Sequence, residues 1–151
     1  MKSSLRIFLI PVLLFFSISS FAQANPDDLV KKFFDEYQTS PVQAINDIYL
    51  TNSWTLRAKD AVDQMKNEVN KYTVDYMGKY YGYVLITQKK LSDDFILYSY
   101  MIKYDRQPLR FTFKLYKPND KWMLFSLKID GNLDDEIEES AKLVYLNLDK
   151  N

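Results

Sequence analysis

The residue types available for chemistry are limited, because the 151-residue sequence contains no histidine and no cysteine. Without histidine there is no serine–histidine–acid triad, no imidazole general base and no histidine ligand for a metal ion. Without cysteine there is no thiolate nucleophile, no zinc–thiolate site and no disulfide. Acid–base chemistry would therefore depend on carboxylates and on the hydroxyls of the 12 tyrosines.

An acidic segment near the C-terminus has part of the spacing of a calcium loop. Asp130, Asn132 and Asp134 follow the D-x-N-x-D pattern of an EF-hand. The sixth position of such a loop is Asp135 instead of glycine, and the twelfth is Ala141 instead of glutamate. Acidic residues at the positive end of a helix dipole explain the segment better. We therefore expect no metal site and no cofactor.

The aromatic residues are the stronger functional lead. Concave, mostly apolar pockets with a few hydroxyls are the usual form of small-molecule sites, and rings on one face of a sheet can line such a pocket. The candidate ligand-binding residues are Trp54, Tyr81, Tyr83, Tyr98, Tyr100, Phe111 and Phe113. Two alternatives stay open, in which these rings fill the core or cover an outer sheet face in a homodimer.

Three helices are expected in the first half of the chain. Asn25 is suited to be an N-cap, because proline and two aspartates follow it. Ser40 and Gln43 have the spacing of a capping box and predict the start of a second, shorter helix. After a break at 51–55, the apolar spacing predicts a third helix over 56–72.

Four strands are expected next. Period-2 alternation and β-rich composition predict them at 80–87, 95–104, 109–116 and 122–129. Gly82 indicates a bend or bulge in the first of these strands, and residues 89–94 are expected to form a loop. Both faces of the strand over 95–104 are apolar or aromatic, which indicates a central strand whose second face meets something.

The last two strands form a predicted hairpin around a turn at 117–121. Pairing Phe113 with Phe125 and Phe111 with Leu127 collects the strongly apolar residues on one face. This register places Phe125 toward the helices and Leu124 outward. Beyond Gly131, helical spacing predicts a C-terminal helix, with a terminal strand over 143–148 as the competing interpretation.

The order of elements predicts an α+β fold, in which N-terminal helices pack on a curved antiparallel sheet of four or more strands and a C-terminal helix follows. This order, with GKYYGY at 78–83 and F-x-x-Y-K-P-x-x-K-W at 113–122, resembles small exported bacterial proteins of the nuclear transport factor 2-like (cystatin-like cone) superfamily. The resemblance covers residues 25–151 as a single domain. It implies a cone-shaped cavity between sheet and helices, which relatives use for small apolar ligands.

The same superfamily contains isomerase-like and cyclase-like enzymes as well as non-catalytic binding and dimerisation modules. A ketosteroid-isomerase-like enzyme would need a buried carboxylate beside aromatic hydroxyls. Asp35, Asp47, Asp75 and Asp105 are the candidates in this sequence. We expect them on helix surfaces or in turns, since aspartate is usually exposed, and we assign no catalytic residue.

The first 24 residues have the three regions of a secretory signal. A basic start is followed by an apolar run over 7–16 and by small residues ending in Ala22-Gln23-Ala24, with cleavage expected after Ala24 or Ala22. A retained membrane anchor is the alternative, against which the short apolar run and Pro11 argue. The sequence thus predicts export to the periplasm or the extracellular space, with no membrane contact after cleavage.

The charge of the remaining domain excludes one class of partner. Removal of Lys2 and Arg6 leaves 18 basic residues against 20 acidic ones. A general nucleic-acid or anionic-membrane binder would need a basic excess. The leading hypothesis is a non-catalytic domain that binds a small apolar ligand or a protein partner. An isomerase- or cyclase-like enzyme and a homodimer through the outer sheet face are the alternatives.

Overall fold

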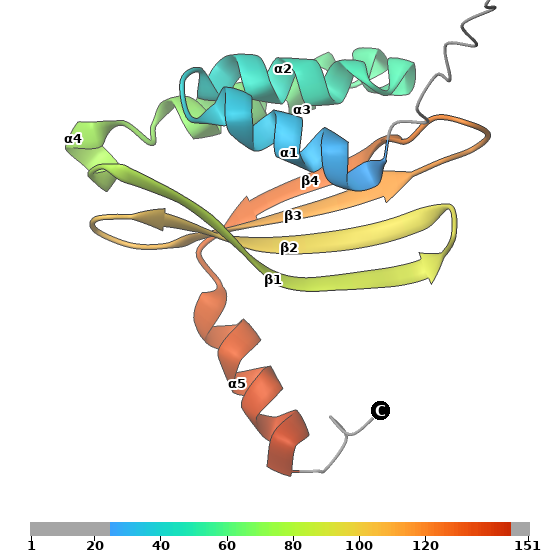
Figure 1. Cartoon of the computed structure of the whole chain (residues 1–151). Coiled ribbons are helices and arrows are strands. Elements are labelled where there is room, and N and C mark those ends of the chain that lie inside the picture. Colours follow the sequence, from blue (N-terminus) through green and yellow to red (C-terminus); the bar gives the residue numbers. More distant parts are fainter. Residues whose placement is uncertain (1–24, 146–151) are drawn as a thin grey trace, which may run out of the picture.

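The computed structural model describes residues 25–145, which place four helices and a 3₁₀ helix before a sheet and one helix after it (Figure 1). The elements are α1 (Pro26–Tyr37), α2 (Pro41–Leu50), η1 (Ser53–Arg57), α3 (Lys59–Asn70), α4 (Val74–Met77), β1 (Tyr80–Ser92), β2 (Phe95–Tyr104), β3 (Leu109–Tyr116), β4 (Met123–Asp130) and α5 (Leu133–Tyr145). The predicted α+β class is confirmed. The predicted signal lies outside the described residues, and no helix within them is long and apolar enough to cross a membrane.

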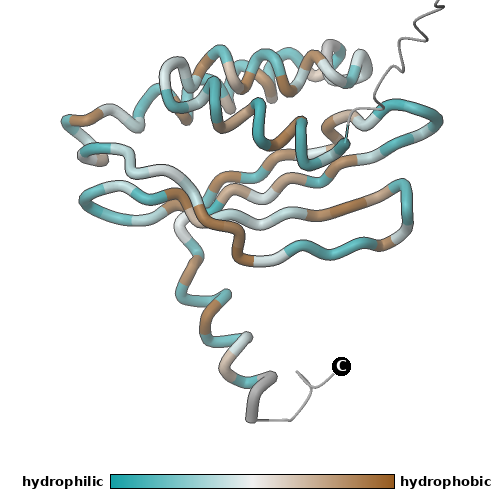
Figure 2. The backbone as a smooth tube through the Cα atoms, viewed as in Figure 1, coloured by the Kyte–Doolittle hydropathy of each residue, from teal (hydrophilic) through white to brown (hydrophobic). Residues whose placement is uncertain are grey.

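The four strands form one antiparallel meander in the order β1-β2-β3-β4. Helices α1, α2 and α3 lie over one face of this sheet, and α5 projects away on the opposite side (Figure 1). The turns that join the strands are mainly hydrophilic, and hydrophobic residues lie along the strands between them (Figure 2). The sheet is therefore covered by helices on one face only.

Aromatic residues of α1 make the core contact with the sheet. Phe33 meets Phe113 edge to face with ring centroids 5.0 Å apart, and Tyr37 meets Phe111 in the same way at 5.3 Å. All four residues are buried, as is the neighbouring Phe34. Aromatic pairs in this geometry contribute about 0.5–1.5 kcal/mol beyond the area they bury. The space between α1 and the centre of the sheet is thus filled by side chains.

The predicted starts of α1 and α2 are both confirmed, but only the first has the predicted capping hydrogen bond. The side chain of Asn25 accepts a hydrogen bond from the amide of Asp27, so the predicted cap of α1 is confirmed. The predicted capping box at Ser40 is wrong, because the Ser40 side chain makes no capping hydrogen bond. Gln43 instead donates to Asp47 one turn later, at 2.6 Å.

The predicted helix over 56–72 is divided in two. Residues Ser53–Arg57 form the 3₁₀ helix η1, and α3 begins only at Lys59, after Ala58 leaves helical geometry (φ −101°, ψ 45°). The Asn52 side chain accepts the amide hydrogen of Trp54 and so fixes the start of η1. Local hydrogen bonding by a short polar side chain therefore overrides the apolar spacing here.

Strand β1 is longer than predicted. It continues to Ser92, with Lys89 opposite Leu97 and Lys90 opposite Ile96, so the predicted loop at 89–94 is wrong over most of its length. The predicted irregularity at Gly82 is confirmed, since the pairing with β2 shifts between Tyr80 and Tyr83. Gly82 has φ +93°, a conformation that glycine adopts without steric cost.

The predicted register of the β3–β4 hairpin is wrong. Phe113 pairs with Leu127, and a bulge at Phe125 then brings Leu124 opposite Leu115. The extra residue exchanges the two faces, so Leu124 is fully buried and Phe125 is 58% exposed. The cause is tertiary: the amide of Leu124 donates to the Thr51 hydroxyl, and its carbonyl accepts from the Asn52 side chain.

The C-terminal helix is confirmed as α5 over Leu133–Tyr145, and the competing strand is wrong as far as residue 145. Residues 146–148 of that strand lie outside the described part of the chain. Arg110 of β3 anchors the helix start. Its guanidinium donates to both carboxylate oxygens of Asp130 and, through Nη1, to Glu136 at 2.6 Å.

The turn between β2 and β3 is tied to α4. Arg106 donates to the carbonyls of Asp75 and Tyr76 at the end of this helix, and Asp105 accepts the amide hydrogen of Lys79 at 2.5 Å. Gly78 lies between these contacts with φ +81°, and a Cβ atom there would collide with the Asp105 side chain. The close approach therefore requires glycine at this position.

We predict that Gly78→Ala destabilises the fold by about 2–4 kcal/mol, because it adds a collision to an unfavourable φ. Gly82→Ala, with a similar φ but open space, is expected to cost about 1 kcal/mol. Gly131→Ala, which meets nothing within 4 Å, is the control and should change the stability by less than about 0.5 kcal/mol. Urea unfolding measures the free energy of unfolding of each variant, and an equal decrease for all three variants would contradict this order.

The Asp130 carboxylate generates a prediction about pH. Burial alone would raise its pKa, but hydrogen bonds from Arg110 and Lys128 outweigh burial and hold the pKa of Asp130 below its usual 3.8. A depressed pKa means that the stabilisation is complete above about pH 4 and is lost as the pH falls through the folded-state pKa. Asp130→Asn should therefore cost about 1–2 kcal/mol at pH 7 and less at pH 2.5.

Urea unfolding of both proteins at the two pH values measures this difference. Asp35→Asn is the matched control, because Asp35 pairs with Lys31 on the exposed face of α1 and should matter little at either pH. A cost for Asp130→Asn that is the same at pH 7 and pH 2.5 would contradict the assignment.

Candidate functional site

Five of the seven predicted aromatic residues come together between α1 and the sheet. Phe111 and Phe113 have no exposed surface, and Tyr98 is also buried. Tyr83 stacks on Phe34 of α1 with centroids 3.8 Å apart, and Tyr100 meets the same ring edge to face at 5.1 Å. These residues contact α1 where the predicted ligand would lie, so their described role is core packing.

The other two predicted residues lie on the surface, away from this group. Trp54 is 67% exposed on η1, with the guanidinium of Arg57 4.5 Å from its ring centroid. Tyr81 is 53% exposed on β1, with Lys79 5.4 Å from its ring. Asp105 beside Tyr81 raises the pKa of that phenol. The structure therefore does not bring Trp54 and Tyr81 into one site with the others.

The four candidate carboxylates lie on helix surfaces or in turns. Asp35 is exposed beside Lys31, Asp75 is exposed on α4, and Asp105 is exposed in the β2–β3 turn. Asp47 is half-buried on α2 and accepts hydrogen bonds from Gln43 and Asn46. Within the described part of the chain, none of the four accepts a hydrogen bond from a buried tyrosine hydroxyl, so they do not form the carboxylate–tyrosine pocket of the isomerase hypothesis.

The structure contains one carboxylate–tyrosine pair that the sequence analysis did not predict. The Tyr98 hydroxyl donates to Asp27 in the first turn of α1 at 2.5 Å, and the Gln88 amide donates to the same hydroxyl. Burial, together with Asp27, raises the pKa of Tyr98, and the same two causes raise the pKa of Tyr100 to about 12. Both phenols stay protonated at neutral pH, and the pair fastens α1 to β2.

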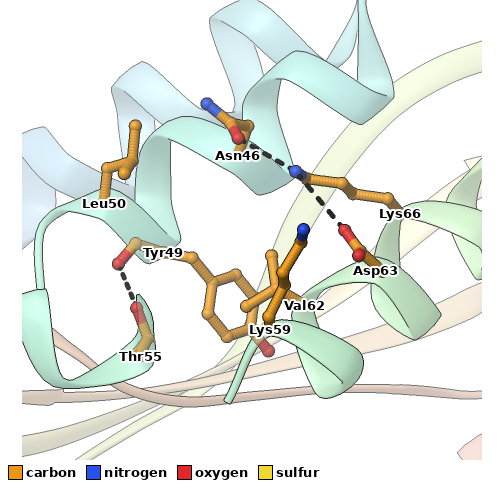
Figure 3. Close-up of a pocket in the computed structure, with 8 residues that line it drawn as sticks. All are labelled: Asn46, Tyr49, Leu50, Thr55, Lys59, Val62, Asp63 and Lys66. Atoms are coloured by element: carbon orange, nitrogen blue, oxygen red, sulfur yellow. Dashed lines mark hydrogen bonds and ion pairs between the residues drawn. The ribbon is translucent and has the colours of Figure 1, made fainter. Parts of the chain in front are cut away.

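A separate pocket lies within the helical layer, between α2, η1 and α3 (Figure 3). Its volume is about 230 Å³, and it is partly open to solvent. The residues that line it are Asn46, Tyr49, Leu50, Thr55, Lys59, Val62, Asp63 and Lys66. This helical pocket is distinct from the predicted cone-shaped cavity, because all of its lining residues precede the sheet.

Short-range hydrogen bonds give the helical pocket its shape. The Thr55 hydroxyl donates toward the carbonyls of Tyr49 and Asn52 at 2.6 and 2.7 Å, which holds η1 against the end of α2. The Tyr49 ring then lies between α2 and α3, near Val62 (Figure 3). Burial raises the pKa of Tyr49, so this wall is neutral at physiological pH.

The rim of the helical pocket is basic. Lys66 donates to the Asn46 side chain at 3.0 Å, and its ammonium lies 3.9 Å from Asp63. Lys59 has no carboxylate partner within 4.0 Å among the described residues, and its side chain lines the same pocket as Tyr49 and Lys66 (Figure 3). A pocket that has an apolar wall and two ammonium groups suits a ligand with an apolar body and one negative charge.

The sequence prediction missed this pocket for a definable reason. Tyr49 and Val62 match the apolar stripes of two helices, and Lys59, Asp63 and Lys66 match an outward helix face, so each residue has an ordinary explanation alone. The residue spacing on α3 places Lys59, Asp63 and Lys66 on one face. This shared face is the feature of the sequence that could have indicated the rim of the pocket. The break at Ala58 that creates the pocket depends on contacts made by Asn52 and Thr55.

The described residues contain no group of acidic side chains arranged to hold a metal ion. The chain matches no protein-family model, and neither the characterised proteins nor the solved structures include one that is similar to it. The helical pocket therefore has to be interpreted from its own residues.

We predict that Asn52→Ala destabilises the protein by about 2 kcal/mol. Asn52 is buried, and its amide donates to the Leu124 carbonyl at 2.8 Å while its oxygen accepts from Trp54, so the substitution leaves two polar groups without partners. Asn67→Ala on the exposed face of α3 is the control and should change the stability by less than about 0.5 kcal/mol. Denaturant unfolding measures both, and similar effects would show that Asn52 does not hold the layers together.

Proposed function

We propose that this protein is an exported, non-catalytic binding domain whose helical pocket takes a small molecule with an apolar body and one anionic group. The observation that carries the proposal is the Lys59 ammonium, which lines the same pocket as the Tyr49 ring and has no carboxylate partner among the described residues. Export is supported by the signal-like sequence over residues 1–24. The order of helices and strands supports membership of the nuclear transport factor 2-like superfamily.

The size and charge of the helical pocket narrow the ligand class. A volume of about 230 Å³ is below that of most drug-sized sites, so the ligand is a small molecule such as a medium-chain or aromatic monocarboxylate. Lys59 and Lys66 supply two positive charges, and Asp63 on the rim compensates one of them. A monoanion is therefore favoured over a dianion, which would meet the Asp63 carboxylate.

Octanoate and its neutral analogue octanamide test the proposal as a matched pair. We predict that millimolar octanoate raises the melting temperature and that octanamide does so less, because only the carboxylate can pair with Lys59. Lys59→Gln should weaken octanoate binding roughly fivefold, which corresponds to about 1 kcal/mol for a partly exposed ion pair.

Lys32→Gln is the control, because Lys32 lies on α1 beside Glu36 and outside the helical pocket. Titration calorimetry gives the dissociation constants. Equal binding of octanoate and octanamide, or unchanged octanoate binding by Lys59→Gln, would refute the anionic preference. Absence of binding by a panel of small monocarboxylates would refute the pocket itself.

A further inference from the structure

The face of the sheet opposite the helices carries an apolar strip along β2. Leu97 and Met101 alternate with the helix-facing residues of this strand, so they lie on the outer face. Val84 of β1 is paired with Met101 and is exposed, and Phe125 at the bulge packs on Phe95 with centroids 5.4 Å apart. We call Val84, Phe95, Leu97, Met101 and Phe125 the outer strip.

Basic side chains surround the outer strip. Strand pairing and side-chain alternation place these basic residues on the same face of the sheet as the outer strip. All four strands contribute to them. They are Lys89, Lys103, Arg110, Lys114 and Lys128. Among the described strand residues of this face, only Asp130 is acidic, and Arg110 and Lys128 both pair with it. The outer face thus has apolar side chains on either side of the buried Ser99 in β2, and positive charges around them.

Helix α5 has the complementary pattern. Leu133, Ile137 and Ala141 are spaced four residues apart on one stripe, and Ile137 is 68% exposed. Hydrophobic positions alternate with hydrophilic ones along this helix (Figure 2). Its acidic residues are Asp134, Asp135, Glu136, Glu138 and Glu139, against the basic Lys142. An amphipathic helix with an unpartnered apolar stripe needs a surface to cover that stripe.

The anchor of α5 prevents the helix from lying on its own sheet. Only Gly131 and Asn132 separate β4 from α5, and the Asn132 amide donates to Asp130 at 2.9 Å. Arg110 holds both Asp130 and Glu136, so the first turn is fixed at the sheet end while the rest of α5 projects away (Figure 1). While these bonds persist, the outer strip of the same chain is out of reach.

The length of α5 is also sufficient to cross the width of the sheet. Thirteen residues make α5 about 20 Å long, and four strands about 4.8 Å apart span roughly 14 Å. One α5 helix can therefore cross the outer face of a whole sheet. Its acidic residues would then meet the lysines around the outer strip, which is the charge complementarity that fixes orientation at an interface.

We propose that two copies of this chain form a symmetric dimer in which each α5 helix covers the outer strip of the other copy. The apolar stripe of α5 packs on Leu97 and Met101, and the acidic side chains of α5 pair with the basic residues around them. The exchange makes two identical contacts around a twofold axis. It involves no residue of the helical pocket, so it is independent of the proposed ligand binding.

Sedimentation of the chain from residue 25 onward, over a range of concentrations, tests the dimer. We expect a mass twice that of one chain, and a dissociation constant that rises with salt because charges contribute. Met101→Glu on the outer strip and Ile137→Glu on α5 should each raise the dissociation constant at least tenfold. Val74→Glu, which replaces an exposed apolar residue on α4, is the control and should leave it unchanged.

Mixing the two variants tests the exchange itself. Each homodimer of either variant has two damaged contacts, whereas the mixed dimer has one contact in which both surfaces are intact. We therefore expect mixing to restore dimers in part, with circular dichroism confirming that each variant is folded. Lys114→Glu, which changes only a charge of the outer face, should weaken the dimer as well.

Two results would overturn the proposal. One is a monomer at every concentration, which includes the case where α5 folds back on its own sheet. The other is a dimer that Met101→Glu abolishes and Ile137→Glu leaves intact, because such a dimer would join two sheets without α5.

Discussion

The packing of α1 against the centre of β3 is the contact on which the remaining structure depends. Phe33, Phe34 and Tyr37 lie on one stripe of α1 and occupy the space above Phe111 and Phe113. Because interiors are packed as densely as organic crystals, rings of this size leave no room for a further molecule beside them. A fold of this type that binds a ligand must then do so elsewhere, and the break between η1 and α3 opens a second place within the helical layer.

A second constraint links that helical layer to the far edge of the sheet. Thr51 and Asn52 follow α2 and bind the amide and the carbonyl of Leu124 on β4. The same Asn52 starts η1 and thereby shapes one wall of the pocket. Two side chains between α2 and η1 thus determine both the position of β4 and the geometry of the helical pocket.

The features that the sequence predicted correctly are those that depend on residues close together in the chain. The limits of β2 and β3, the cap at Asn25 and the bulge at Gly82 follow from alternation, capping chemistry and glycine, which act over a few residues. The register of β4 did not follow, because the bulge at Phe125 depends on hydrogen bonds from residues more than 70 positions earlier. The sequence predicted that the aromatic residues line a ligand site, but it cannot distinguish the rings of a filled core from the lining of a cavity.

The irregularities of the two edge strands have a consequence for the behaviour of the protein at high concentration. Strand β1 shifts its pairing at three places and carries Lys89 and Lys90, and strand β4 has the bulge at Phe125. Bulges and lysines at sheet edges hinder the addition of another strand, which is the first step toward fibrillar aggregates. An edge that resists strand addition therefore protects each molecule from aggregation through its own backbone geometry.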